Sequence, residues 1–167
     1  MKNVESCCFT GHRPEKLPWK TNESDPRCLA LKAALRDAVR SLYDSGCRRF
    51  YCGMAQGCDL YFGEAVAALR EEKPDLCLEG VVPFEGQSAA WDEASRRRYY
   101  RLAEECDRLT VLHTFYTPDC MIERNRYMVD HADVLLAAYN GSGGGTQATM
   151  LYALRKGIEI IEIPVEK

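Results

Sequence analysis

The sequence predicts an α/β protein in which a mainly parallel β-sheet lies between two layers of helices, a three-layer α/β/α arrangement. Short apolar segments alternate along the chain with longer segments whose apolar residues recur every three or four positions. No linker, repeat or low-complexity segment interrupts this alternation, so residues 1–167 are expected to form a single domain. Glycines and hydrogen-bonding residues gather after the apolar strands, at the edge where ligands bind in such sheets.

The predicted strands are short, apolar and bounded by turn residues. The most apolar of them reads DVLLAAY, a composition typical of a central strand in a parallel sheet. In chain order, the predicted strands are residues 6–9, 49–52, 76–82, 109–112, 133–139 and 158–163.

The predicted helices have apolar residues at helical spacing and recognisable ends. The first begins at Pro26, with Ser24 or Asp25 as its cap, and Gly46 ends it. Alternation of strands and helices predicts right-handed βαβ units with helices on both faces of the sheet. After the first, the predicted helices are residues 60–72, 88–106, 119–131 and a last one that ends at residue 156.

Composition limits the classes of partner. The chain has 22 Lys and Arg and 25 Asp and Glu, so its net charge of −3 offers no bulk attraction to nucleic acid or anionic lipid. We therefore expect nucleic acid to bind weakly at most. No signal peptide and no apolar run of about 20 residues is present, so we expect a cytoplasmic protein without a membrane partner. A homodimer is left open.

Nine cysteines are present without a single C-x-x-C pair. Structural zinc sites need closely spaced Cys or His residues, and His12, His113 and His131 are scattered. In a reducing compartment most of these thiols are expected to act as small buried apolar groups. We predict no metal site and no required cofactor.

The strongest ligand-binding motif is NGSGGGTQ, which lies between the predicted strand 133–139 and the last helix. Glycines let the backbone approach a ligand closely, and the N–H groups at a helix start favour an anion. A flexible loop would be the alternative, at a high entropic cost. Thr146 adds a hydroxyl and is also a candidate cap of the helix. The predicted phosphate-binding residues here are Asn140, Gly141, Ser142, Gly143, Gly144, Gly145, Thr146 and Gln147.

A second segment of this kind, GMAQGCD, follows the strand 49–52. It is neither a G-x-G-x-x-G fingerprint nor a Walker motif. Asp59 is expected either to cap the next helix or to accept a hydrogen bond from a ribose hydroxyl, and both roles remain open. The predicted ligand-binding residues are Gly53, Met54, Ala55, Gly57 and Asp59.

The segment TGHRP follows the first strand and is either a polar turn or part of an anion site. Because the other motifs also follow strands, we favour the anion site. His12 is suited equally to chemistry and to a structural hydrogen bond. The predicted ligand-binding residues are Thr10, Gly11, His12 and Arg13.

Two arginine-containing helical segments have different expected roles. Arg124, in the sequence ERNR, is placed to grip a phosphate, with a solvated charged face as the alternative. Its neighbour Glu123 points in a different direction on a helix, so only one of the two is expected to face the site. The segment RRRYYR, residues 96–101, resembles a nucleic-acid stripe. However, Glu93 and Arg97 share a helix face and other acidic residues lie close by, so a solvated charged face is favoured.

Together, TGHRP, GMAQGCD, the PFEGQ segment that leads to Trp91, and the glycine-rich loop resemble the SLOG superfamily, especially its YpsA-like branch. The segment with ERNR and NGSGGGT is also similar to LOG phosphoribohydrolases and to DNA-processing protein A. The resemblance implies a Rossmann-like domain that binds nucleotides or their sugar derivatives. It places Arg124 at the catalytic arginine of LOG enzymes, but Thr149 falls where those enzymes have a glutamate.

From these features we predict that the protein binds a nucleotide or an ADP-ribose-type nucleotide sugar, as a sensor or regulatory protein rather than as a catalyst. The first alternative is a LOG-type phosphoribohydrolase that cleaves nucleoside 5'-monophosphates. In that reaction Arg124 would act as electrophile and Asp59 or Glu123 would supply the carboxylate. The second alternative is single-stranded DNA binding.

Overall fold

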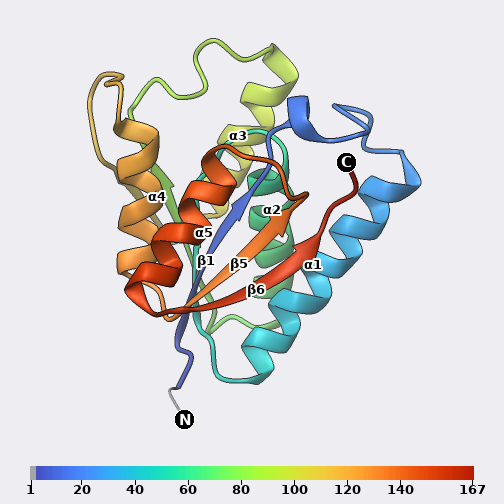
Figure 1. The fold of residues 1–167 in the computed structure, drawn as a ribbon, viewed down its shortest axis with the longest axis vertical. Coiled ribbons are helices and arrows are strands. Elements are labelled where there is room, and N and C mark those ends of the chain that lie inside the picture. The colour runs from blue at the N-terminus through green and yellow to red at the C-terminus, as the bar shows by residue number, and fades with distance from the viewer. Residues whose placement is uncertain (1–2) are drawn as a thin grey trace.

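Among residues 3–167, which the computed structural model describes, six strands form one sheet between two helical layers (Figure 1). Neighbouring strands are parallel throughout, so the sheet is wholly parallel rather than mainly so. The strand order is β4-β3-β2-β1-β5-β6. The strands are β1 (Ser6–Gly11), β2 (Arg49–Cys52), β3 (Cys77–Val82), β4 (Arg108–Val111), β5 (Val134–Tyr139) and β6 (Glu159–Pro164). The predicted Rossmann-like fold class is confirmed.

The strand order reverses direction between β1 and β5. From β1 the chain adds β2, β3 and β4 on one side, and then returns to place β5 and β6 on the other. The two central strands are in register to their ends, where Gly11 lies opposite Ala138. In open parallel sheets this switch point leaves a crevice at the carboxyl ends of the strands, and the predicted ligand-binding loops follow these strands.

The helices cover both faces of the sheet. Helices α1, α2 and α3 pack against one another and enclose the larger apolar core, whereas α4 and α5 pack together over the smaller one. The helices are α1 (Pro26–Asp44), α2 (Cys58–Glu72), α3 (Glu93–Glu105), α4 (Cys120–Asp130) and α5 (Gly145–Lys156), with a short 3-10 helix η1 (Pro14–Lys16) after β1. Within residues 3–167, no helix has both the length and the apolar character that crossing a bilayer requires.

Alternating side chains of β1 divide between the two cores. Cys7 and Phe9 point toward the larger core, where the ring of Phe9 stacks on Phe62 with 4.6 Å between centroids. Cys8, between them, belongs to the smaller core. All nine cysteines lie in the described part of the chain and are free, and seven of them are buried. The prediction that these thiols act mostly as buried apolar groups is therefore confirmed.

Helix starts show where sequence patterns succeed and fail. Asp25 caps α1 by accepting a hydrogen bond from the Arg27 backbone N–H at 2.9 Å, as predicted. The prediction of a helix from residue 88 is wrong, because α3 begins at Glu93. Asp92 is its cap and accepts from the Ser95 N–H at 3.1 Å, whereas residues 84–91 form turns. The helix therefore begins at its capping residue, Asp92, and not at the start of the segment whose apolar residues have helical spacing.

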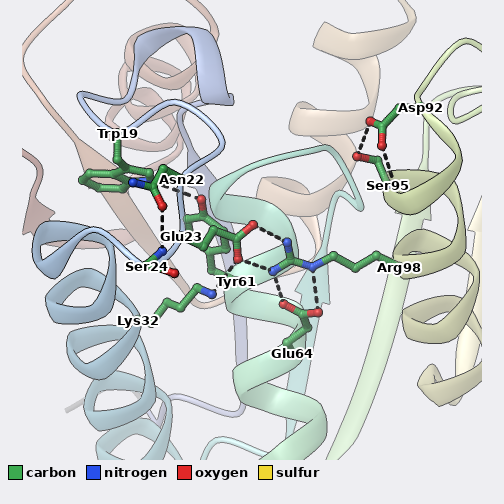
Figure 2. A network of polar contacts seen from close by, with 10 residues as sticks. All are labelled: Trp19, Asn22, Glu23, Ser24, Lys32, Tyr61, Glu64, Asp92, Ser95 and Arg98. Atoms are coloured by element: carbon green, nitrogen blue, oxygen red, sulfur yellow. Dashed lines mark hydrogen bonds and ion pairs between the residues drawn. The ribbon is translucent and has the colours of Figure 1, made fainter.

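An ion-pair network holds the segment between β1 and α1 against the neighbouring helices (Figure 2). The Arg98 guanidinium donates to Glu23 of this segment and to Glu64 of α2, and Lys32 of α1 donates to Glu23 at 2.6 Å. Partial burial lowers the Arg98 pKa, but the hydrogen bonds that Arg98 donates to Glu64 and Glu23 outweigh this effect and raise the pKa. The prediction that residues 96–101 form a solvated charged face is therefore wrong for Arg98. Arg97 is exposed and pairs with Glu93, as expected.

Candidate functional site

A cavity of about 320 Å³ lies at the switch point between β1 and β5, and we call it the switch-point cavity. Its walls come from β1 and the segment after it, from the segment before α2, and from the starts of α4 and α5. It is lined by Phe9, Thr10, Gly11, His12, Arg13, Glu15, Lys16, Ala55, Asp59, Met121, Arg124, Asn125, Gly145 and Thr146. Nine residues predicted from three separate sequence motifs and from ERNR therefore meet at one place.

The glycine-rich loop contributes less of this lining than its sequence suggests. Gly145 and Thr146, the first two residues of α5, line the cavity. Asn140 instead shapes the loop, since its side-chain oxygen accepts from the Ser142 backbone N–H at 2.9 Å and from the Ser142 hydroxyl at 2.6 Å. The predicted residues Asn140, Gly141, Ser142, Gly143, Gly144 and Gln147 lie outside the lining.

The start of α5 has no side-chain cap. Gly144 occupies the cap position with φ 135°, so the expectation that Thr146 caps the helix is wrong. The N–H groups of a helix's first turn have no partner within the helix, and together with the helix dipole they favour an anion. Gly145 and Thr146 present this turn to the cavity.

Arg124 is the most deeply placed cation of the cavity, with 4% of its surface exposed. Its Nη1 donates to the Gly53 carbonyl, and its Nε donates to the Asn125 side-chain oxygen at 2.8 Å. Burial lowers the pKa of the guanidinium, and the nearby Asp59 carboxylate opposes that shift. Arginine stays charged under such conditions, so the cavity contains a buried positive group.

Asp59 faces the same side of Gly53 as this arginine side chain and is also buried. Its Oδ2 accepts a hydrogen bond from the Ala55 backbone N–H at 3.2 Å. Burial raises the pKa of the carboxyl group, and the charge of Arg124 acts in the opposite direction. Gly57 occupies the cap position of α2 without a side-chain hydrogen bond, so the capping role considered for Asp59 is wrong.

Gly53 must be glycine because both buried charged groups occupy the space beside its Cα. A Cβ there would lie 2.8 Å from both Arg124 Nη1 and Asp59 Oδ2, which is closer than side-chain atoms approach. Gly53, Met54 and Gly57 do not line the cavity themselves. These three residues lie next to lining residues and help to hold them in place. The Cys58 N–H also donates to the carbonyl of the lining residue His12 at 3.1 Å.

Glu123 lies apart from Arg124, as its neighbouring helix position predicted. Its carboxylate is about half exposed and pairs with His113 Nε2 outside the cavity lining. The structure therefore does not bring Glu123 to the place where a catalytic carboxylate would act. Thr149 is buried, and its hydroxyl donates to the Gly145 carbonyl at 2.8 Å.

His12 has a structural hydrogen bond across the switch point. Its Nε2 accepts from the Asn140 backbone N–H at 3.1 Å, a geometry that requires an unprotonated nitrogen. Burial and the charge of Lys16 both lower the pKa of the imidazole and so favour that neutral form. The hydrogen bond ties the loop after β1 to the loop after β5.

Lys16 is the clearest residue that sequence reasoning missed. It belongs to η1, lines the cavity, and donates from Nζ to the Gly143 carbonyl of the glycine-rich loop. It lies two residues after TGHRP, so extending that motif by two residues would have included it. Met121 and Asn125 were also missed, although they lie beside Arg124 at helical spacing on α4.

The charges around the cavity differ in balance from those of the whole chain. Arg13, Lys16 and Arg124 are cationic, Glu15 and Asp59 are acidic, and His12 is neutral. The local balance is thus positive by one charge, against −3 for the chain. In the described part of the chain, no three His, Cys, Asp or Glu side chains gather as a metal-ligating group. The arrangement suits an anionic organic ligand.

Comparisons with known proteins agree on a family. The YpsA model, described as the YspA SLOG family, matches residues 7–163. The UPF0398 protein of Staphylococcus haemolyticus is 30% identical over 123 residues, which cover 72% of this chain and 66% of that protein. The UPF0398 protein of Bacillus velezensis is 27% identical over 158 residues, which cover 93% of this chain and 86% of that protein.

Two solved structures share the fold. One is DNA processing protein A from Helicobacter pylori, described with a single-stranded DNA binding mode, at a TM-score of 0.64 and 14% identity. The other is DNA processing protein A from Streptococcus pneumoniae, at a TM-score of 0.63 and 15% identity. They match 97% and 96% of this chain, which spans 66% and 50% of their lengths. At such identities the likeness shows the fold alone.

Proposed function

This chain belongs to the YpsA family, the YspA SLOG family of the matching model, and on that premise we propose that its switch-point cavity binds a nucleotide or an ADP-ribose-type nucleotide sugar. We further propose that it acts as a sensor or regulatory protein. One observation carries the proposal: the buried guanidinium of Arg124 and the uncapped start of α5 line the same cavity at the switch point.

The phosphate would lie at the start of α5. The N–H groups of the first turn favour an anion there, and a phosphate is the anion that nucleotides offer. Lys16 and Arg13 line the same cavity and add positive charge to it. Charge-assisted hydrogen bonds of this kind are about twice as strong as neutral ones.

The sugar would lie toward Asp59. One carboxylate oxygen accepts from the Ala55 N–H, and the other oxygen keeps its capacity to accept from a ribose hydroxyl. A neutral imidazole at His12 completes a wall that contains donors and acceptors without a concentrated negative charge. A phosphorylated sugar matches a cavity that offers both cationic donors and a carboxylate acceptor.

Hydrolysis of the nucleotide is the weaker candidate. An N-glycosidic transition state carries positive charge on the ribose, which a fixed carboxylate stabilises. Thr149 replaces the glutamate expected for LOG enzymes, and its hydroxyl is already engaged with the Gly145 carbonyl. Loss of one such electrostatic group typically costs about 10²–10³ in rate. We therefore propose binding without useful turnover.

Single-stranded DNA binding is also weaker. The proteins of similar fold include one described as binding single-stranded DNA, but the basic segment of α3 does not form an open stripe here. Arg98 is held by Glu23 and Glu64, and Arg97 is paired with Glu93. Few positive charges therefore remain on that helix to release counterions from a phosphate backbone.

The proposal is tested by binding and turnover in parallel. Native mass spectrometry of freshly purified protein should detect a co-purified nucleotide, and calorimetry should show binding of AMP and ADP-ribose but not of adenosine. Adenosine is the matched control for AMP, from which it differs only by the phosphate. Equal binding of adenosine, or no binding of any of the three, would contradict the proposal. Sustained release of ribose 5-phosphate that disappears in Arg124→Ala would instead support the enzyme.

A further inference from the structure

Gln87 is a buried polar residue between β3 and α3, and the proposed function does not use it. Its exposed fraction is 7%, and it belongs to the PFEGQ segment that the sequence singled out. The side-chain Nε2 donates to the Met54 carbonyl at 2.8 Å and lies 3.4 Å from the Gly53 carbonyl. A side chain from another strand's loop therefore grips the backbone directly behind the switch-point cavity.

The backbone that it grips is strained. Met54 is fully buried and has φ 62°, in the left-handed region that residues other than glycine rarely adopt. Such a conformation persists only where the surroundings hold it. The side chain of Met54 packs in the larger core, so another residue at this position would lose apolar contacts. Hydrogen bonds to the backbone are the remaining means of holding the conformation.

Three side chains supply these hydrogen bonds from different directions. Arg124 donates to the Gly53 carbonyl, Gln87 donates to the Met54 carbonyl, and Asp59 accepts from the Ala55 N–H. Arg124 thus holds the Gly53–Met54 peptide, whereas Gln87 and Asp59 hold the two polar atoms of the Met54–Ala55 peptide. Two of these side chains line the cavity, whereas Gln87 does not.

The orientation of the Gln87 amide follows from its surroundings. Turning the amide over would bring its oxygen against two carbonyl oxygens, so Nε2 must face Gly53 and Met54. In this orientation Oε1 is buried without a hydrogen-bond partner among residues 3–167. An unpaired buried oxygen destabilises a protein, so the contact with the strained backbone has to offset that cost.

We propose that Gln87 is a positioning residue of the switch-point cavity. It holds the left-handed peptide at Met54, so that the Gly53 carbonyl and the Ala55 N–H orient Arg124 and Asp59 toward the ligand. The inference rests on the proposed function for its effect on binding. Its effect on Arg124 is independent of any ligand. A phosphorylated ligand would therefore bind weakly to a folded protein that lacks this one amide.

The test compares Gln87→Met with Gln56→Met. Both changes keep the length of the side chain and remove its amide, but Gln56 lines a different cavity, together with Arg98 and Arg101. Affinity for ADP-ribose is measured by calorimetry well below the melting temperature of each variant. We expect binding about tenfold weaker in Gln87→Met, as for the loss of one buried hydrogen bond with its backbone geometry, and unchanged within twofold in Gln56→Met.

A ligand-free readout separates this inference from the proposed function. The Arg124 Nε–H signal in ¹⁵N NMR should exchange faster with water in Gln87→Met than in the parent, and should be unaffected in Gln56→Met. An unchanged Arg124 signal would overturn the inference whatever the protein binds. If the signal changes but the parent binds none of the phosphorylated ligands, the proposed function fails and the positioning of Arg124 by Gln87 stands.

Gln87→Glu provides a second variant with its own signature. A carboxylate cannot donate to the Met54 carbonyl, but the protonated acid can. The affinity of Gln87→Glu for ADP-ribose, divided by that of Gln87→Met, should therefore rise as the pH is lowered from 7.5 to 5.5. Asp59 and Arg124 are present in both variants, so their own titration affects both affinities alike. A merely structural role for Gln87 predicts no such pH difference between two folded proteins, and its absence would count against positioning.

Discussion

Gly145 allows the fold and the binding site to be perturbed separately. It is the first residue of α5 and lines the switch-point cavity, and no atom lies within 4 Å of the position that a Cβ would occupy. The change Gly145→Val therefore places its methyl groups in empty space. Those methyl groups would lie where we propose that the phosphate meets the first turn of the helix.

The expected magnitudes are very different for folding and for binding. A helical glycine is less favourable than other residues by up to about 1 kcal/mol, so the free energy of unfolding should stay equal or rise slightly. A phosphate held by two charge-assisted hydrogen bonds gains about 3–6 kcal/mol from them. Losing them should weaken AMP and ADP-ribose binding by at least about 100-fold.

Gly157 supplies the matched control at the other end of the same helix. A Cβ there would also meet no atom within 4 Å, but its φ is 76°. Gly157→Ala should therefore cost about 1–2 kcal/mol of stability through the left-handed backbone, without changing ligand affinity. The two variants should thus show opposite patterns in thermal unfolding and in calorimetric titration.

The refuting results follow from the same pair of measurements. If Gly145→Val binds a ligand as tightly as the parent does, the phosphate does not lie at the start of α5. If Gly145→Val lowers stability by as much as Gly157→Ala, the space beside Gly145 is not empty in solution, and the loss of binding would no longer locate the site.

Three further predictions concern His12, Arg98 and nucleic acid. Because the pKa of His12 is lowered in the folded protein, the unfolded chain binds the proton at a higher pH than the folded one. The free energy of unfolding of the parent should therefore fall as the pH falls below about 6.5, and that of His12→Gln should fall less steeply. Urea unfolding at pH 7 and at pH 5.5 measures both. Arg98→Met should cost about 1–2 kcal/mol in thermal unfolding, whereas the exposed Arg97→Met should cost less than about 0.5; equal costs would contradict the network. Single-stranded DNA should be released by about 0.2 M salt in a filter assay, and salt-resistant retention would favour the DNA interpretation.

The positions that sequence predicted well share one physical cause. Parallel strands end at one edge of a sheet, so residues at or after strand ends, such as Thr10 and Thr146, meet without further information. Arg124 was found because a helix start beside a strand end reaches the same edge. These rules locate a residue by its place along one element, and they need no knowledge of side-chain partners.

The positions that sequence missed depend on contacts between distant elements. Asp59 was considered as a helix cap because carboxylates favour helix starts, yet it accepts from Ala55 in the preceding loop. Lys16 reaches the glycine-rich loop across 127 residues of chain, and Gln87 reaches Met54 across 33. A local sequence pattern does not show which hydrogen-bond partner each of these side chains has, because several polar groups nearby in the sequence could equally well have been that partner.

The partners of the cations explain how an acidic chain can hold an anion site. Away from the cavity, arginines pair with carboxylates, as Arg98 does with Glu23 and Glu64, and each such pair cancels charge. In the cavity, Arg124 and Lys16 donate instead to the backbone carbonyls of Gly53 and Gly143. A carbonyl orients a cation without neutralising it. The charge of Lys16, and the part of the Arg124 charge that the nearby Asp59 carboxylate does not offset, therefore remain available inside a partly buried space where Coulomb interactions are strong. The chain's net charge of −3 then repels nonspecific polyanions, whereas a small phosphorylated ligand that fits the cavity meets a positive field.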